Sequence, residues 1–529
     1  MNPAQAMNLG RLLTHTALLF PERPAVIEDG GRTWSWREIE ERVAAMATAL
    51  RALGVGRGER ILVQSRNTVQ MFESCWVAFR MGCVWVPTNF RLTPAEVAYL
   101  GASSGASVML AEDVFPGHVD AVRAASPALR HVVRVGGARD GEHDYETLVA
   151  QHRGQDAPHE TVGPDDPLWF FYTSGTTGRP KAGVLTHGQM SFVVTNHLAD
   201  LIPGTTESDC SIAVAPLSHG AGIHALLNVA RGAATVLPAG DRLDPEAVWR
   251  AVQTWRVSNL FTVPTIVKML VEHESVDRYD HSSLRHVIYA GAPMYRADQK
   301  LALQKLGPVL VQYFGLGEVT GCITVLPPQL HSADDADPNA NIGSCGRPRT
   351  GMEVAVLDAD MNPVPTGQVG EICCRGPAVF AGYHGNAEAT AKALRGGWFH
   401  TGDLGRLDAR GLLYITGRES DMYISGGSNV YPREVEEVLL THPAVAEVAV
   451  LGVPDPKWGE IGVAVVVRRA GSDVDRDGLL AHLEGRCARY RWPQHVFFWD
   501  ALPKSGYGKI VKKDIRERLI EEGAVSVTT

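Results

Sequence analysis

FYTSGTTGRPKAG, at residues 171–183, ends an apolar run in a short stretch rich in glycine and hydroxyl side chains. The pattern predicts a β-strand that opens into a phosphate-binding loop. Gly175 and Gly178 let backbone N–H groups turn inward, four Ser or Thr hydroxyls can donate hydrogen bonds, and Lys181 supplies positive charge. An ordinary surface turn is rich in the same residues. The stretch alone favours the phosphate loop and leaves the turn open.

The spacing excludes the two standard glycine-rich nucleotide loops. A Walker A loop requires Gly-Lys-Ser/Thr after its second glycine, but Gly178 is followed by Arg179 and Pro180, and Lys181 by alanine. A dinucleotide-binding loop runs straight into a helix, and Pro180 interrupts that entry. The phosphate site is therefore of another kind.

Composition limits the class of protein. A chain of 529 residues that is 45% hydrophobic can form two or more domains, and a net charge of −9 disfavours nucleic acid and acidic membranes as partners. The first twenty residues predict an amphipathic helix rather than a signal peptide, and no apolar run is long enough to span a membrane. Eight scattered cysteines favour a reduced, cytoplasmic setting.

The order of apolar runs predicts an α/β fold. Strand-like runs alternate with helix-period segments, which is typical of layers built on largely parallel strands. The predicted strands are 211–217, 258–264, 286–293 and 309–318, and the predicted helices are 247–255 and 265–273. In such sheets ligands bind beyond the carboxyl ends of the strands. We therefore expect 171–183, 216–224, 289–293 and 314–321 to share one site.

The pattern of predicted secondary structure changes twice towards the C-terminus. From about residue 340, short predicted strands at 353–360, 370–376 and 411–417 indicate a β-barrel-like subdomain. A compact α+β unit follows, with a helix at 477–490 among its elements. We predict a large N-terminal domain at 1–417, a hinge at 418–421 and a small mobile C-terminal domain at 422–529.

Six motifs in this order resemble those of the adenylate-forming superfamily, which holds acyl-CoA synthetases, amino-acid adenylation domains and luciferases. They cover almost the whole chain: YTSGTTGRPK (172–181), FGLGE (314–318), GEICCRG (370–376), WFHTGD (398–403), YITGRESDMYISGGSNVYPREVE (414–436) and PKSGYGK (503–509). The resemblance implies two half-reactions. A carboxylate first attacks the α-phosphorus of ATP to give acyl-AMP and pyrophosphate, and a thiol then takes the acyl group.

The resemblance also implies roles for single residues. Glu318 would bind Mg²⁺, Asp403 the ribose, and Lys509 would bridge the attacking carboxylate and the α-phosphate. Taken singly, each residue also fits a position without a catalytic role: Glu318 a helix start, Asp403 a turn and Lys509 an exposed tail. The remaining implied ATP- and AMP-binding residues are Thr173, Ser174, Gly175, Thr176, Thr177, Gly178, Lys181, Gly291, Ala292, Phe314, Gly315 and Arg418. Gly426 and Gly427 would border the CoA channel, and Ser420 would be the hinge.

By the same resemblance, mostly small or apolar residues would line the acyl pocket, which favours a neutral fatty, branched or aromatic acid. They are His219, Val263, Thr265, Ala290, Leu316, Gly317, Thr320 and Gly321. His219 would pack at or gate the entrance for the carboxylate. PLSHGAGIH (216–224) lacks the aspartate of amino-acid adenylating enzymes, and Tyr313 stands where malonate ligases carry arginine. Amino acids and dicarboxylates are therefore disfavoured, because a buried unpaired charge is costly.

The chain departs from the family pattern at two of these positions. Gly317 replaces a threonine whose hydroxyl ordinarily donates to the α-phosphate. Either Thr320 or water takes its place, or adenylation is slower; the glycine could also make room for a bulky acid. Ser420 replaces the usual charged hinge residue, so no charge holds either orientation of the small domain.

The sequence thus predicts an AMP-forming acyl-CoA synthetase that uses ATP, Mg²⁺ and CoA. The expected partners are a small carboxylic acid, ATP and CoA, without nucleic acid or integral membrane association, and a homodimer is left open. Three alternatives remain: an acyl-AMP ligase that loads a carrier protein, a luciferase-type enzyme, and a nucleotide-binding protein that has lost catalysis.

Overall fold

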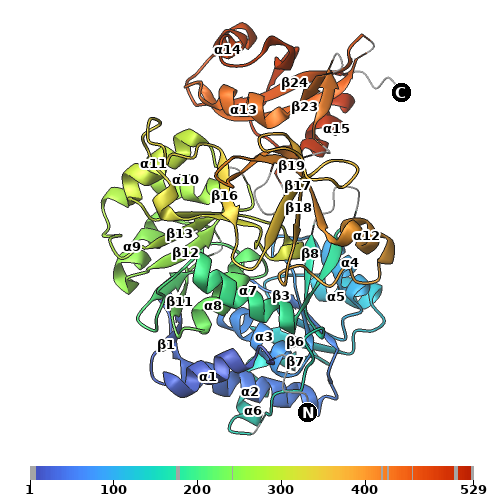
Figure 1. Ribbon diagram of the computed structural model, residues 1–529. Coiled ribbons are helices and arrows are strands. Elements are labelled where there is room, and N and C mark those ends of the chain that lie inside the picture. The colour runs from blue at the N-terminus through green and yellow to red at the C-terminus, as the bar shows by residue number, and fades with distance from the viewer. Residues whose placement is uncertain are drawn as a thin grey trace.

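The computed structural model describes residues 7–155, 157–173, 179–240, 242–292, 294–418, 421–425, 428–455, 457–504 and 510–525. Figure 1 shows a large N-terminal domain, coloured blue to yellow and light orange, and a small C-terminal domain in orange and red. The predicted combination of a large α/β domain and a small α+β domain is confirmed. The first helix, α1 (Arg11–Leu19), is also where the sequence predicts it.

The first sheet of the large domain has seven strands in the order β7-β6-β5-β3-β4-β8-β9. All of its pairs are parallel except β8 with β9, which are antiparallel. The strands are β3 (Arg60–Gln64), β4 (Val84–Pro87), β5 (Val108–Glu112), β6 (His131–Val135), β7 (His143–Asp144), β8 (Pro167–Thr173) and β9 (Lys181–Thr186). Its chain segment also holds α2 (Trp36–Ala52), α3 (Val69–Arg80), α4 (Pro94–Ser104), α5 (His118–Ala125) and α6 (Tyr145–His152).

The second sheet has thirteen strands in the order β17-β18-β19-β20-β16-β15-β14-β13-β12-β10-β11-β1-β2. Its middle, from β14 to β1, is parallel, as the alternation of the sequence predicts. The parallel strands are β1 (Pro24–Glu28), β10 (Cys210–Ile212), β11 (Ala234–Leu237), β12 (Asn259–Thr262), β13 (His286–Tyr289) and β14 (Leu310–Phe314). At the edge, β2 (Thr33–Ser35) pairs antiparallel with β1. The helices of this part are α7 (His187–Asp200), α8 (Gly220–Val229), α9 (Pro245–Trp255), α10 (Pro264–Glu272) and α11 (Arg296–Leu306).

The predicted β-rich region is antiparallel and continuous with this second sheet. Strand β16 pairs with β15 on one side and with β20 on the other, and so joins the two parts. The antiparallel strands are β15 (Thr324–Leu326), β16 (Ser344–Pro348), β17 (Glu353–Leu357), β18 (Gly370–Arg375), β19 (Phe399–Leu407) and β20 (Leu413–Arg418). Helix α12 (Ala387–Ala393) and the short 3₁₀ helices η1 (Glu274–Asp277), η3 (Pro328–Leu330) and η4 (Arg395–Gly397) complete the large domain.

The small domain has its own sheet, β22-β21-β24-β23, with β25 paired to β24. Its elements are β21 (Tyr423–Ser425), β22 (Ser428–Val430), α13 (Pro432–Leu440), β23 (Val445–Asp455), β24 (Gly459–Arg468), α14 (Arg476–Leu483), η5 (Arg489–Arg491), β25 (His495–Phe498) and α15 (Lys512–Glu521). The helix predicted at 477–490 is wrong in its second half. Helix α14 ends before Gly485, which has a left-handed φ of 71° that a right-handed helix cannot contain.

Apolar burial fixes how the two large sheets pack. The main core cluster contains side chains from strands of both sheets and from the helices beside them, among them Phe79 of α3, Met190 of α7 and Leu226 of α8.

Within the described ranges, no helix is both long enough and apolar enough to cross a membrane. All eight cysteines are unpaired thiols, and seven of them are buried.

A buried ion-pair network joins helices α2, α3 and α6. Arg42 Nε lies 2.5 Å from Glu73 Oε1, and its NH1 lies 2.7 Å from Glu146 Oε2. The Tyr145 hydroxyl donates to Glu73 Oε2 at 2.8 Å. The Glu73 side chain has no exposed surface. Removing one partner would leave a buried charge without compensation.

We predict that Arg42→Ala lowers the free energy of unfolding by about 3–5 kcal/mol, measured by urea unfolding with tryptophan fluorescence. Arg37→Ala, on the same helix, is the matched control. The Arg37 side chain is 56% exposed, and its one ion pair with a described residue is to exposed Glu22, so its loss should cost under about 1 kcal/mol. Equal losses in the two variants would show that burial of the network has no effect on stability.

Candidate active site

Three neighbouring parallel strands bring predicted site segments to one edge of the second sheet. Strands β12, β13 and β14 pair in register and end at Thr262, Tyr289 and Phe314. The segments 263–266, 290–292 and 314–321 follow directly. Because the carboxyl ends of parallel strands lie at the same edge, these segments come together. Two of them, 290–292 and 314–321, fall within the segments predicted to share one site.

Glu318 connects this edge to the first sheet. It lies in the 3₁₀ helix η2 (Gly317–Val319) and is only 5% exposed. Thr173 Oγ1, at the end of β8, donates to Glu318 Oε1 at 3.1 Å, and the Tyr383 hydroxyl donates to the same oxygen at 2.8 Å. Both hydrogen bonds that described residues make with this carboxylate fall on Oε1. The carboxylate is therefore fixed in orientation, and Oε2 accepts no hydrogen bond from the described residues.

Tyr383 is a site residue that the sequence analysis missed. Burial, together with the nearby Glu318 charge, raises the pKa of Tyr383, so its hydroxyl stays a neutral donor. Lys181 Nζ lies 5.0 Å from the centroid of its ring, within the range of a cation–π contact. An isolated bridge between Gly183 and Tyr383 holds the tyrosine beside β9. A single tyrosine in a glycine-flanked turn gives no sequence signal for this role.

The strand that precedes the predicted phosphate loop is confirmed, and a partner strand follows it. Thr173 and Lys181 are register partners at the end of the antiparallel pair β8–β9 where the predicted loop connects the strands. The residues between them that were assigned to phosphate binding, Ser174, Gly175, Thr176, Thr177 and Gly178, lie outside the described residues. The two ends of the loop thus stand next to Glu318 and Tyr383.

Asp403 and Arg418 face each other across the antiparallel strands β19 and β20. Arg418 Nε lies 3.2 Å from Asp403 Oδ1. The Asp403 side chain is 8% exposed and the Arg418 side chain 44% exposed. Two residues predicted to contact the nucleotide therefore form one pair, with a buried carboxylate and an accessible guanidinium.

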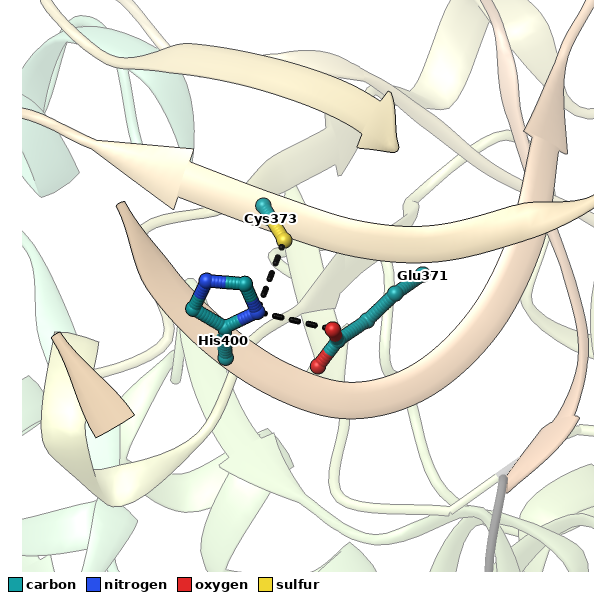
Figure 2. Close-up of side chains that lie close together, drawn as sticks. All are labelled: Glu371, Cys373 and His400. Atoms are coloured by element: carbon teal, nitrogen blue, oxygen red, sulfur yellow. Dashed lines mark hydrogen bonds and ion pairs between the residues drawn. The ribbon is translucent and has the colours of Figure 1, made fainter. Parts of the chain in front are cut away.

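Figure 2 shows Glu371, Cys373 and His400 on the adjacent strands β18 and β19. His400 Nδ1 lies 2.7 Å from Glu371 Oε2 and 3.4 Å from Cys373 Sγ. Glu371 Oε1 also accepts the backbone N–H of Gly402 at 3.2 Å, in the residue before Asp403. Gly402 has a φ of 69°, in the left-handed region that glycine enters without strain. The cluster thus supports the turn that presents Asp403.

These three side chains carry ligand atoms of the kinds that bind transition metals, all within 4.8 Å of one another. Both oxygens of Glu371 already have partners. Oε1 accepts the Gly402 N–H, and Oε2 lies beside His400 Nδ1 and 3.1 Å from Arg395 Nη2. Burial raises the pKa of the Cys373 thiol to about 12, so it is not a thiolate. We interpret the cluster as a hydrogen-bonded support.

The residues assigned to the acyl pocket and the adenine side are described but differ in exposure. Ala290, Thr320 and Gly321 are buried, and His219, Val263, Ala292, Phe314, Gly315, Leu316 and Gly317 are partly buried. Gly291 and Thr265 are exposed, the latter in the first turn of α10. His219, at the start of α8, packs its ring on Phe171 with centroids 4.3 Å apart.

Gly317 does not leave space where a side chain would stand. A Cβ at this position would lie 2.7 Å from two ring carbons of Phe171 and 2.9 Å from the Thr173 methyl carbon. The expectation that this glycine makes room for a bulky acid is therefore wrong in the direction of its Cβ. Thr320 does not replace the missing hydroxyl either, since its buried Oγ1 is directed to Cys322 Sγ at 4.0 Å.

Four more predicted residues lie outside the described residues: Ser420, predicted as the hinge, Gly426 and Gly427, predicted beside the CoA channel, and Lys509, predicted as catalytic. The residues on either side of the last segment, Lys504 and Ile510, form an isolated antiparallel bridge.

Comparison with known families gives a clear assignment. The AMP-binding enzyme family matches residues 13–384, and the AMP-binding enzyme C-terminal domain matches residues 434–509. The chain belongs to the AMP-binding enzyme family. The proposed superfamily resemblance is thereby confirmed.

Curated relatives of this AMP-binding enzyme extend over almost its full length. It is 39% identical to a feruloyl-CoA synthase of an Amycolatopsis species, over 96% of this chain and 99% of that protein. It is 33% identical to an indoleacetate–CoA ligase of Aromatoleum aromaticum, over 95% and 94%. The enzyme is therefore an ATP-dependent acid–thiol ligase of the acyl-CoA synthetase class.

A solved structure agrees with this assignment. The o-succinylbenzoate CoA synthetase of Bacillus subtilis, in complex with its acyl-adenylate intermediate, superposes with a TM-score of 0.83. It is 28% identical, and the match covers 96% of this chain and 97% of that one. The two chains therefore share the whole two-domain fold.

We predict that Gly317→Ala lowers the free energy of unfolding by about 1–3 kcal/mol and reduces pyrophosphate release with every acid, because the new methyl group overlaps Phe171. Gly56→Ala is the matched control, since its Cβ would meet nothing within 4 Å. Phe171→Leu in the Gly317→Ala background should recover part of the loss. A Gly317→Ala enzyme as stable and active as wild type would contradict this packing.

Proposed function

We propose that the enzyme activates an aromatic carboxylic acid as its acyl-adenylate, with Mg²⁺ bound at Glu318, and then transfers the acyl group to CoA. The carboxylate oxygen attacks the α-phosphorus of ATP, the bond to the β-phosphate breaks, and pyrophosphate leaves. The sulfur of CoA then attacks the acyl carbon, and AMP leaves. The observation that carries the proposal is the Glu318 carboxylate, fixed by Thr173 and Tyr383 beside Lys181.

The residues at this junction fit a hard divalent cation. Mg²⁺ prefers carboxylate oxygens, and Glu318 offers Oε2 while both hydroxyl donors occupy Oε1. Mg²⁺ held there would offset negative charge on the transferring phosphate. Lys181 would add a second positive charge from the end of β9, next to the predicted phosphate loop.

The Asp403–Arg418 pair suits the nucleoside half of ATP. A buried carboxylate can accept hydrogen bonds from both ribose hydroxyls, and the half-exposed guanidinium can move to a phosphate oxygen. Glu371 would act through the Gly402 turn as a positioning residue. Lys509 would bring its charge to the attacking carboxylate when the small domain closes, with Ser420 as the pivot and Gly426 and Gly427 beside the thiol.

The acid is proposed to be aromatic because of the relatives and the rings at the site. Feruloyl-CoA synthase and indoleacetate–CoA ligase are named for aromatic acids. The rings of Phe171 and His219 lie near the proposed carboxylate end, with centroids 4.3 Å apart and planes tilted by 30°, and a planar acid can pack against them.

The test is pyrophosphate release and thioester formation over a panel of linear, branched and aromatic acids, with either CoA or a carrier protein as acceptor. We expect aromatic acids to release pyrophosphate and the thioester to form on CoA. Glu318→Gln should slow pyrophosphate release about 10²–10³-fold, because an amide cannot replace the carboxylate beside the phosphates.

Tyr383→Phe is the matched control for this variant. It keeps the ring near Lys181 and removes one hydrogen bond to a charged group, so the loss should be about tenfold. Pyrophosphate release by Glu318→Gln at the wild-type rate, with the same Mg²⁺ dependence, would contradict the proposed metal site. Thioester formation on the carrier protein alone would contradict CoA as the acceptor.

A further inference from the structure

Three rings form a layer at the edge of the second sheet where the predicted acyl pocket begins. His224 of α8 stacks on Phe261 of β12, with ring centroids 4.5 Å apart and planes 10° apart. Tyr313 of β14 lies 5.9 Å from His224 and 5.8 Å from Phe261, with planes inclined by 23° and 12°. We call these three residues the ring layer.

The ring layer packs directly on backbone that belongs to the predicted pocket. A Cβ at Gly220 would lie 2.6 Å from Phe261 Cε1, and a Cβ at Gly321 would lie 2.4 Å from Tyr313 Cε2. Gly220 follows the predicted gate His219, and Gly321 is itself a predicted pocket residue. Phe261 and Tyr313 therefore lie directly against the backbone of the predicted pocket, and a side chain at either glycine would separate the two.

His224 carries two polar nitrogens into the ring layer, and the described residues offer neither of them a partner. The residue is 4% exposed, and neither Nδ1 nor Nε2 has a hydrogen-bond partner among the described residues. Burial, with the charge of Arg349 second, lowers the pKa of His224 to about 3. The ring is therefore neutral, with one N–H donor and one lone pair, and leaving both unused inside a protein is costly.

A single water molecule would satisfy only one of the two ring nitrogens of His224. His224, Phe261 and Thr235 border a small internal cavity, and the Thr235 hydroxyl also lacks a partner within the described part of the chain. A water there could join one nitrogen to Thr235. The two ring nitrogens point to different sides of the imidazole, so the second still calls for a ligand group.

We propose that His224 forms a hydrogen bond with a hydroxyl group on the aromatic ring of the acid, and that the enzyme thereby selects hydroxylated aryl acids. A phenol donates to the imidazole lone pair or accepts its N–H, and its flat ring packs against Phe261 and Tyr313. An unsubstituted ring or an alkyl tail leaves the nitrogens unpaired. This inference rests on the proposed acid activation and names its substrate class.

The experiment compares kcat/KM for matched acids: cinnamic against 4-hydroxycinnamic acid, and benzoic against 4-hydroxybenzoic acid. The two pairs place the hydroxyl at two distances from the carboxylate. We expect wild type to prefer the hydroxylated member of at least one pair by about tenfold or more, the effect of one buried hydrogen bond. His224→Phe keeps the stacking and lacks both nitrogens, so the ratio should fall to about one.

Two further variants distinguish recognition from packing. His224→Asn keeps a donor and an acceptor and should restore part of the preference. Thr235→Val removes the cavity hydroxyl and should leave the ratio as in wild type. A kcat/KM ratio that is unchanged in His224→Phe, or the absence of any preference in wild type, would overturn the inference. Pyrophosphate release at equal rates with both acids of a pair would leave the proposed function intact. Release with no acid at all would overturn both.

Discussion

The position of the Glu318 carboxylate is the constraint on which the site depends. Its Oε1 accepts one hydroxyl from Thr173 of the first sheet and one from Tyr383, which is bridged to β9. The backbone carbonyl oxygen of Glu318 accepts the Phe380 N–H at 2.8 Å. Glu318 is thus held by two segments, one ending at Thr173 and one at 380–383, that are far apart in sequence. This geometry leaves no space for a side chain at Gly317, whose neighbour Phe171 fills the gap between the sheets.

The second half of the site is built on antiparallel strands instead. Asp403 and Arg418 become partners through the register of β19 and β20, and Glu371 on β18 fixes the turn before Asp403. Because β16 joins these strands to the parallel part of the sheet, the proposed nucleoside side and the proposed metal side belong to one continuous framework.

The sequence predicts what is local and misses what is brought together by packing. Apolar runs locate strands such as β12 and β13, and the motifs single out Glu318 and Asp403, because each signal lies within a few neighbouring residues. Tyr383 and the filled space at Gly317 depend on contacts between distant segments, which no local pattern encodes. The same holds for the unpaired nitrogens of His224, since burial and partners are properties of the folded chain.

Transfer of an isotope from the acid to AMP tests the central claim most directly. The enzyme is given ATP, Mg²⁺, CoA and a substrate acid whose carboxylate carries ¹⁸O, and the AMP is analysed by mass spectrometry. If the carboxylate attacks the α-phosphorus, each AMP gains one labelled oxygen and the pyrophosphate gains none. Unlabelled AMP, or label in the pyrophosphate, would contradict the adenylation of the acid at the site beside Glu318.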